Sequence, residues 1–357
     1  MTDTLSPLGI MAQRGPTVLW NDSSDPAELA ESITFGCVGA TCNPVIALAA
    51  IRADLPTWQA RIKELAAGEM AEATESEIGW RVVEEVSLKA AKLLEPAFEK
   101  YQGINGRLSM QTDPRLARSA SALVDQAAHF DSLAKNIIVK IPATKVGTAA
   151  IEEATYRGVN INVTVSFSAA QAVLTGEAIE RGLKRREAEG LDISTMGPVV
   201  TIMVGRVDDW IKDCYARDGL TFDQNYLEWS GVAAFKNAYA EFNKRGLRSR
   251  LLSAAFRNTL HWSEFVGGNV VISPPFGWQK RIQASGAGAE DRMDIPVDPQ
   301  ILETLLTMPE FRKAYEIDGL TIDEVDSFGP TRKTLRQFLG ADEELDHIVR
   351  DILIPAP

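Results

Sequence analysis

Short apolar runs rich in β-branched residues alternate with helical patterns from the N-terminus to about position 275. This alternation is typical of parallel strands joined by crossover helices. Eight runs predict eight strands, which favour a closed (β/α)8, or TIM, barrel over an open doubly wound sheet. The expected strands are Thr17–Trp20, Gly36–Ala40, Gly106–Met110, Ile137–Ile141, Val159–Val165, Val199–Val204, Leu251–Phe256 and Val270–Ser273.

Two further stretches lie outside this alternation. From about Pro56 to Tyr101 the apolar residues recur at helical spacing that breaks near Gly68, which predicts two or more helices inserted after the second strand. The remainder after Pro299 predicts C-terminal helices. We therefore expect residues 1–357 to form a single barrel domain, with C-terminal helices from about residue 300.

Composition and charge restrict the partners and the compartment. The chain is 45% hydrophobic and 24% charged, as in ordinary globular proteins, and its net charge of −12 disfavours nucleic acid and anionic lipid. Cys37, Cys42 and Cys214 show no C-x-x-C spacing, and no window approaches the roughly 18 apolar residues of a membrane-spanning helix. We expect a cytoplasmic protein with no bound metal and no membrane partner; a homo-oligomer remains compatible with the sequence.

Polar residues follow or end the expected strands. In a parallel barrel the reactive groups lie at the C-terminal ends of the strands, so these residues should meet at one mouth. They are Asp22, Thr41, Asn43, Gln111, Lys140, Asn162, Thr164, Arg206 and Arg257.

Lys140 is the most informative of these residues, because it interrupts an apolar strand between Val139 and Ile141. Burial there would lower the pKa of the amine and favour its neutral form, which attacks carbonyls to give a Schiff base. The structural interpretation is a lysine whose stem is buried and whose ammonium reaches water.

Asp22 and Asn43 each allow a catalytic and a structural interpretation. Asp22 follows a strand and precedes the helix cap Asp25, so we assign acid–base chemistry to Asp22, with a turn aspartate as the structural interpretation. Asn43 precedes Pro44, which is also the pattern of a helix N-cap.

Arg206 and Arg257 lie near neighbouring strand ends on an otherwise acidic chain. Guanidinium forks bind phosphate with two parallel hydrogen bonds, so the two arginines predict a phosphate site. Either arginine could instead pair with Asp208 or Asp209.

Several segments in register along the barrel resemble the transaldolase family. They are Gly39–Pro44 (GATCNP), Arg107–Pro114 (RLSMQTDP), Asn136–Thr144 (NIIVKIPAT), Gly158–Thr164 (GVNINVT), Met203–Arg206 (MVGR) and Ala255–Asn258 (AFRN). The resemblance extends from about Pro16 to Ser273, and it implies a class I aldolase on a (β/α)8 barrel with no metal and no organic cofactor.

The resemblance implies a role for each site residue. Lys140 would form the Schiff base with a ketose phosphate, and Asp22 would take and return the proton of the C4 hydroxyl. Thr164 would help to hold a catalytic water. Arg206 and Arg257 would bind the phosphate. Asn43 and Asn162 would hold the hydroxyls of the dihydroxyacetone unit. Thr41 and Thr201 are further expected substrate-binding residues.

Three positions depart from the family pattern. Gln111 stands where transaldolases have a glutamate that activates the catalytic water, and the fructose-6-phosphate aldolase branch has glutamine there. Met203 matches neither the phenylalanine nor the tyrosine of the two branches. Ala255 replaces a serine that assists phosphate binding.

The leading interpretation is a transaldolase that moves a dihydroxyacetone unit from a ketose phosphate to an aldose phosphate. The long insertion and the C-terminal region favour it, whereas Gln111 favours a fructose-6-phosphate-type aldolase that releases free dihydroxyacetone. The sequence also allows a non-catalytic sugar-phosphate-binding barrel, or an unrelated phosphate-binding barrel, such as an isomerase, in which Lys140 is only electrostatic.

Overall fold

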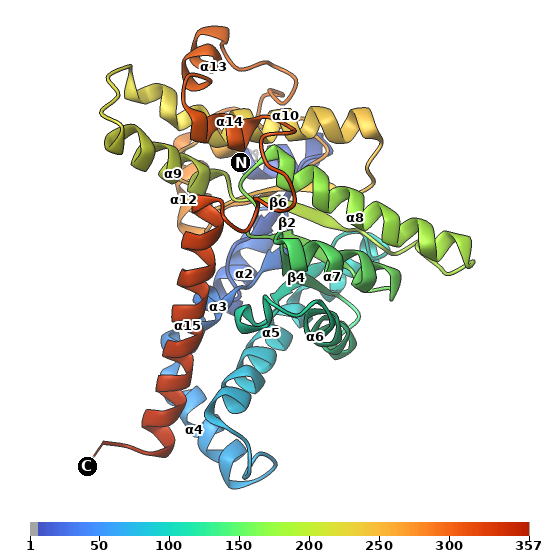
Figure 1. The fold of residues 1–357 in the computed structure, drawn as a ribbon. Helices are drawn as coiled ribbons and strands as arrows, with labels where there is room; N and C mark the ends of the chain where they lie inside the picture. The colour runs from blue at the N-terminus through green and yellow to red at the C-terminus, as the bar shows by residue number, and fades with distance from the viewer. Residues whose placement is uncertain (1–5, 357) are drawn as a thin grey trace, which may run out of the picture.

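The computed structural model describes residues 6–356, and its centre is a closed barrel of eight parallel strands in chain order (Figure 1). Each strand pairs with its neighbours in sequence, and β8 pairs with β1 to close the barrel. The predicted fold class is therefore confirmed. The strands are β1 (Val18–Asn21), β2 (Cys37–Thr41), β3 (Arg107–Gln111), β4 (Ile137–Pro142), β5 (Ile161–Thr164), β6 (Val199–Ile202), β7 (Arg250–Ala254) and β8 (Val271–Ser273).

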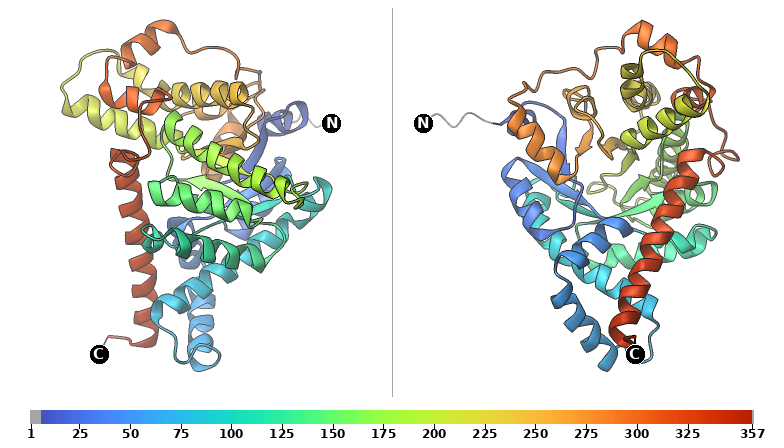
Figure 2. Two further views of the ribbon diagram at one scale, coloured as in Figure 1. Left: turned by 45° about the vertical axis from the view of Figure 1, so that its right-hand side comes forward. Right: turned by 90° about the vertical axis from the view of Figure 1, so that its left-hand side faces the viewer.

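Helices surround the barrel and connect its strands (Figure 2). Outside the connection from β2 to β3, the helices of the crossover connections, with two 3₁₀ turns, are α2 (Pro26–Thr34), η1 (Pro114–Leu116), α6 (Ala120–Leu133), α7 (Lys145–Tyr156), α8 (Ala169–Ala188), α9 (Val204–Arg217), η2 (Gln224–Trp229), α10 (Ser230–Arg245) and α11 (Leu260–Ser263). The remaining helices are α1 (Pro7–Arg14), α3 (Pro44–Ala53), α4 (Leu55–Ala67), α5 (Glu75–Lys100), α12 (Phe276–Ser285), α13 (Pro299–Leu305), α14 (Pro309–Tyr315) and α15 (Gly329–Leu353). None of the helices between residues 6 and 356 is long and apolar enough to cross a membrane.

The lower part of the barrel interior is apolar. Trp20 from β1 is fully buried there, in a cluster with Ile138 of β4, Val199 of β6 and Leu252 of β7. A side chain on β2 could not share this space, because a Cβ on Gly39 would lie 2.5 Å from the Trp20 ring. The glycine therefore lets one indole fill the lumen beneath the strand ends.

A second apolar core lies beside the barrel. It joins α3, α4 and the N-terminal half of α5 to the C-terminal half of α15, through residues that include Ile51, Ile62, Val82 and Leu345. Both views in Figure 2 show this end of α15 running next to α4 and α5, away from the strands. The predicted insertion of helices after strand two is confirmed, and the C-terminal helix packs against it as well as against the barrel.

Leu345 provides a test of this second core. Its side chain is 4% exposed and packs against Gly79 of α5. We expect Leu345→Ala to lower the free energy of unfolding by about 2–5 kcal/mol, because truncation removes buried contacts and leaves a cavity. Urea unfolding followed by circular dichroism measures the change. The neighbouring exposed residue gives the control Glu343→Ala, and equal midpoints for the two variants would show that Leu345 does not hold α15.

Candidate active site

Lys140 lies in the barrel interior, on the same face of β4 as Ile138. Residues two apart on a strand point the same way, so the lysine stands one layer above the apolar cluster. Its side chain is buried, with 6% exposed. In the strand register it pairs with Gln111 of β3 on one side and Asn162 of β5 on the other.

The surroundings of Lys140 favour a neutral amine. Burial lowers the pKa of its ammonium group below the ordinary value, while the charges of Asp22 and Cys42 act in the opposite direction. Burial prevails because an ammonium ion loses its hydration inside the barrel. The position of Lys140 is thus compatible with the neutral amine that formation of a Schiff base requires.

Asp22 follows β1 and approaches the lysine closely enough for its charge to act on the lysine's pKa. Its carboxylate accepts a hydrogen bond from the hydroxyl of Thr41, at the end of β2. The helix cap, in contrast, is Asp25, whose side chain accepts from the amides of Ala27 and Glu28. The structure therefore assigns the structural task to Asp25 and leaves Asp22 at the barrel mouth.

Asn162 is held at both ends of its amide. Its carbonyl oxygen accepts from Thr201 Oγ1 at 2.7 Å, and its Nδ2 donates to Ser109 Oγ at 3.1 Å. Asn162 and Ser109 are fully buried. These bonds fix the orientation of the amide and use one of the two N–H donors of Nδ2. Ser109 was not among the predicted site residues, although it lies two residues before Gln111.

The other three predicted polar residues have different environments. Gln111 is 5% exposed, and its Oε1 is buried without a hydrogen-bond partner in the part of the chain that is described. Asn43 is the N-cap of α3, with its Oδ1 accepting from the amide of Ile46 at 3.0 Å, so the structural interpretation of this residue is correct. Its Nδ2 remains a donor for a ligand. Thr164 is buried at the end of β5, in register with Pro142.

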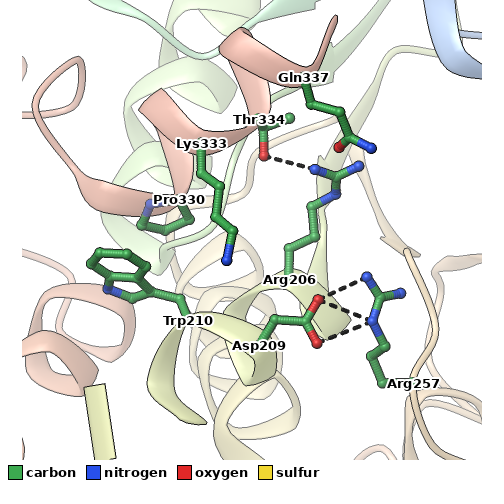
Figure 3. A pocket seen from close by; sticks show the side chains of 8 residues that line it. All are labelled: Arg206, Asp209, Trp210, Arg257, Pro330, Lys333, Thr334 and Gln337. Atoms are coloured by element: carbon green, nitrogen blue, oxygen red, sulfur yellow. Dashed lines mark hydrogen bonds and ion pairs between the residues drawn. The ribbon is translucent and has the colours of Figure 1, made fainter. Parts of the chain in front are cut away.

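Arg206 and Arg257 line one cavity of about 350 Å³ (Figure 3). Arg206 was expected at the end of the sixth strand, but that strand ends earlier, at Ile202, and Arg206 lies in the first turn of α9. Burial and the neighbouring Arg257 lower the pKa of Arg206. The two guanidinium groups are therefore close enough for each to act on the other's charge, an arrangement that an anion would stabilise.

Arg257 is held by a carboxylate and a histidine. Its guanidinium forms a bidentate ion pair with Asp209, with Nη2 2.7 Å from Oδ2, as the sequence allowed. Its backbone N–H donates to Nδ1 of the buried His261 at 3.1 Å. Nε2 of that histidine lies 2.8 Å from Asp208 Oδ2. His261 therefore positions the loop that carries the arginine.

Two non-glycine residues after strand ends have left-handed backbone conformations. Val165 follows β5 with φ of 52°, and Ala255 follows β7 with φ of 62°. Such conformations disfavour side chains with a Cβ, so neighbouring contacts must maintain them. Gln171 Nε2 donates to the Val165 carbonyl at 3.2 Å, and Arg257 Nη1 donates to that of Ala255 at 3.1 Å.

The contribution of α15 to the mouth was not predicted from the sequence. Lys333, Thr334 and Gln337 line the arginine cavity, and Asp342 lines a small cavity that Gln111 also borders. Burial raises the pKa of the Asp342 carboxyl to about 7, with a further upward effect from the nearby Asp113. No local signal could have placed these residues, because they lie beyond the resembling segments and reach the site only through tertiary packing.

A metal site is not apparent at this mouth or elsewhere: within residues 6–356, no three His, Cys, Asp or Glu side chains are grouped so that they could hold a metal ion. The fold and the site define the class of protein, a (β/α)8 barrel with a polar mouth built around one buried lysine. Residues 19–323 match the family described as "Transaldolase/Fructose-6-phosphate aldolase". The chain belongs to this family.

Curated relatives agree with this assignment. The chain is 37% identical to "Transaldolase" of Thiobacillus denitrificans over 155 residues, which are 43% of each chain. It is 32% identical to "Transaldolase 1" of Streptomyces coelicolor over 244 residues, 66% of this chain and 62% of that one. With "Transaldolase 2" of Streptomyces avermitilis the identity is 34% over 261 residues, 67% of this chain and 69% of the relative. The chain thus spans less than two thirds of the length of the first two of these relatives.

The low pKa of Lys140 can be tested by its reactivity. Only neutral amines undergo reductive methylation, and a lower pKa makes a larger fraction neutral at a given pH. We expect the labelling of Lys140 to reach half its maximum at lower pH than that of Lys145, whose pKa is raised by its ion pair with Asp323. Peptide mass spectrometry after labelling between about pH 6 and pH 11 measures both residues. A higher midpoint for Lys140 would contradict the role of burial.

Proposed function

We propose that the protein is a transaldolase, which transfers a dihydroxyacetone unit from a ketose phosphate to an aldose phosphate. The observation that carries the proposal is the buried amine of Lys140, with the carboxylate of Asp22 near it at the C-terminal mouth of the barrel. Membership in the transaldolase/fructose-6-phosphate aldolase family and the names of the relatives support this choice.

The neutral amine of Lys140 attacks the C2 ketone of the donor, and loss of water gives an iminium ion. Asp22 then takes the proton of the C4 hydroxyl, the C3–C4 bond breaks, and an aldose phosphate leaves while the electron pair enters the iminium to form an enamine. The enamine carbon attacks the carbonyl of the acceptor aldehyde, whose oxygen receives the proton from Asp22. Addition of water releases the new ketose and restores the amine.

The neighbouring side chains would orient the reacting groups. Thr41 holds the Asp22 carboxylate by a hydrogen bond, which keeps one of its oxygens in a fixed direction. We assign the free N–H groups of Asn43 and Asn162 to the hydroxyls of the dihydroxyacetone unit, with Thr201 fixing the second amide. No bound cofactor enters these steps.

Water addition is the step at which Gln111 matters. We assign the positioning of this water to Gln111 and Thr164, whose side chains are buried at the ends of β3 and β5. An amide holds a water molecule but does not accept its proton. In the aldolase branch of the family, which has glutamine at this place, the enamine is protonated and dihydroxyacetone leaves as the free product. This residue favours the second candidate, an aldolase that releases free dihydroxyacetone.

The substrates would be small sugar phosphates bound at Arg206 and Arg257, whose local positive charge offsets the net charge of −12 on the chain. A cytoplasmic location fits three free and buried cysteines, Cys37, Cys42 and Cys214, because thiols remain reduced there.

Acceptor dependence separates the two candidates. We expect the purified protein to release glyceraldehyde 3-phosphate from fructose 6-phosphate with erythrose 4-phosphate present and much less without it. Lys140→Met should lower the rate by at least about 10³-fold, since no other group supplies the imine. Lys145→Met removes an exposed lysine and serves as the matched control. Equal release without the acceptor would identify an aldolase, and near-normal turnover by Lys140→Met would refute the Schiff base.

The role of position 111 is tested by Gln111→Glu. A carboxylate can accept a proton from the water that the amide only holds, so we expect the variant to raise transfer relative to simple cleavage. The ratio of the new ketose phosphate to free dihydroxyacetone, measured in one reaction, reports the change. Gln59→Glu adds the same charge on the exposed face of α4, away from the barrel mouth, and supplies the control. An unchanged ratio in Gln111→Glu would show that this residue does not set the outcome.

A further inference from the structure

The arginine cavity has two walls from distant parts of the chain. Arg206 and Asp209 come from α9 and Arg257 from the loop after β7, and the opposite wall is formed by the first turns of α15. Figure 3 shows Lys333, Thr334 and Gln337 of this helix facing the arginines. The cavity, of about 350 Å³, is in the range of small-molecule sites.

Thr334 and Arg206 form the centre of this arrangement. The threonine is 1% exposed, and its hydroxyl accepts a hydrogen bond from Arg206 Nη1 at 3.1 Å. Because the hydroxyl oxygen is the acceptor, the hydroxyl hydrogen can be donated to an anion. Within the described residues Arg206 Nε is buried with no hydrogen-bond partner. Phe338, one turn along α15, lies under the guanidinium, with its ring centroid 5.8 Å away.

The other two cations of the cavity form ion pairs that an anion can replace. Lys333 Nζ lies 2.7 Å from Asp213 Oδ2, and both side chains are more than half exposed. Arg257 pairs with Asp209, also partly exposed. Exposed ion pairs contribute little stability, and a doubly charged phosphate is a stronger acceptor for either cation than one carboxylate. The cavity therefore combines one fixed guanidinium with two cations that can be redirected.

We propose that α15 is part of the phosphate site: Thr334 donates its hydroxyl hydrogen and Lys333 its ammonium hydrogens to the phosphate that Arg206 binds. The helix thereby supplies a hydroxyl to the cavity, whereas Ala255, where the family resemblance expects a serine, carries none. This makes α15 a determinant of specificity for phosphorylated over unphosphorylated sugars. The inference rests on the proposed function for the identity of the sugar, but not for the binding of phosphate.

Substitutions on α15 test the inference. We expect Thr334→Val to raise the KM for fructose 6-phosphate about 10-fold or more, because it loses a hydrogen bond to a charged group, while Thr334→Ser keeps near-parental values. Lys333→Met should raise the KM about 3- to 10-fold, with a smaller effect at high salt. Arg336→Met removes a charge from the exposed face of the same helix, outside the cavity, and should change the KM less than 2-fold.

Two further readouts separate a binding role from a structural one. The first is borohydride trapping of unphosphorylated dihydroxyacetone on Lys140, which all four variants should retain. The second is calorimetric binding of inorganic phosphate, which should weaken in Thr334→Val and Lys333→Met and be unchanged in Thr334→Ser and Arg336→Met.

The outcomes distinguish the two proposals. Parallel losses for phosphorylated and unphosphorylated substrates, or phosphate binding equal in all variants, would overturn the inference. If the parental protein forms no adduct at Lys140 and shows no turnover, the proposed function fails. The calorimetric comparison then still decides whether α15 binds phosphate.

Discussion

The burial of one amine inside an apolar lumen is the constraint on which the rest of the site depends. Lys140 stands directly above a layer closed by Trp20, so water cannot reach it from below. Its polar neighbours among the described residues are therefore those at the strand ends, and their arrangement is correspondingly fixed: Thr41 holds Asp22, and Asn162 is held by hydroxyls at both ends of its amide. A looser mouth would hydrate the ammonium and raise its pKa again.

Much of this could be predicted from the sequence, because the signals are local. All eight strands are confirmed, since buried parallel strands appear as short β-branched runs, and the interrupted run at Lys140 indicated the central residue. Capping residues such as Asp25 act within one turn and were interpreted correctly. The division of the chain into a single domain stays a prediction, as do the roles assigned to the site residues.

The remaining features depend on contacts between distant segments. Arg206 was placed on a strand because the apolar run continues to Val204, whereas the helix begins at that residue. The sequence offered two partners for Arg257, and only the packing of His261 against Asp208 leaves Asp209 for it. The sequence did not predict that α15 forms a wall of the cavity. Apolar residues at helical spacing indicate that one face of a helix is buried, but not which element packs against it.

The helix α15, of 25 residues, contributes side chains to both apolar cores. Phe338 packs in the barrel core, and Val349, three turns later, packs in the second core with α3 to α5. Because helix formation is cooperative, the stability of the C-terminal end of α15 is coupled to that of its N-terminal end. An anion bound between α9 and α15 would consequently slow amide hydrogen exchange in α3, α4 and α5, which pack against the C-terminal half of α15. By reciprocity, a change that destabilises this second core would lower the affinity for the anion by the same factor.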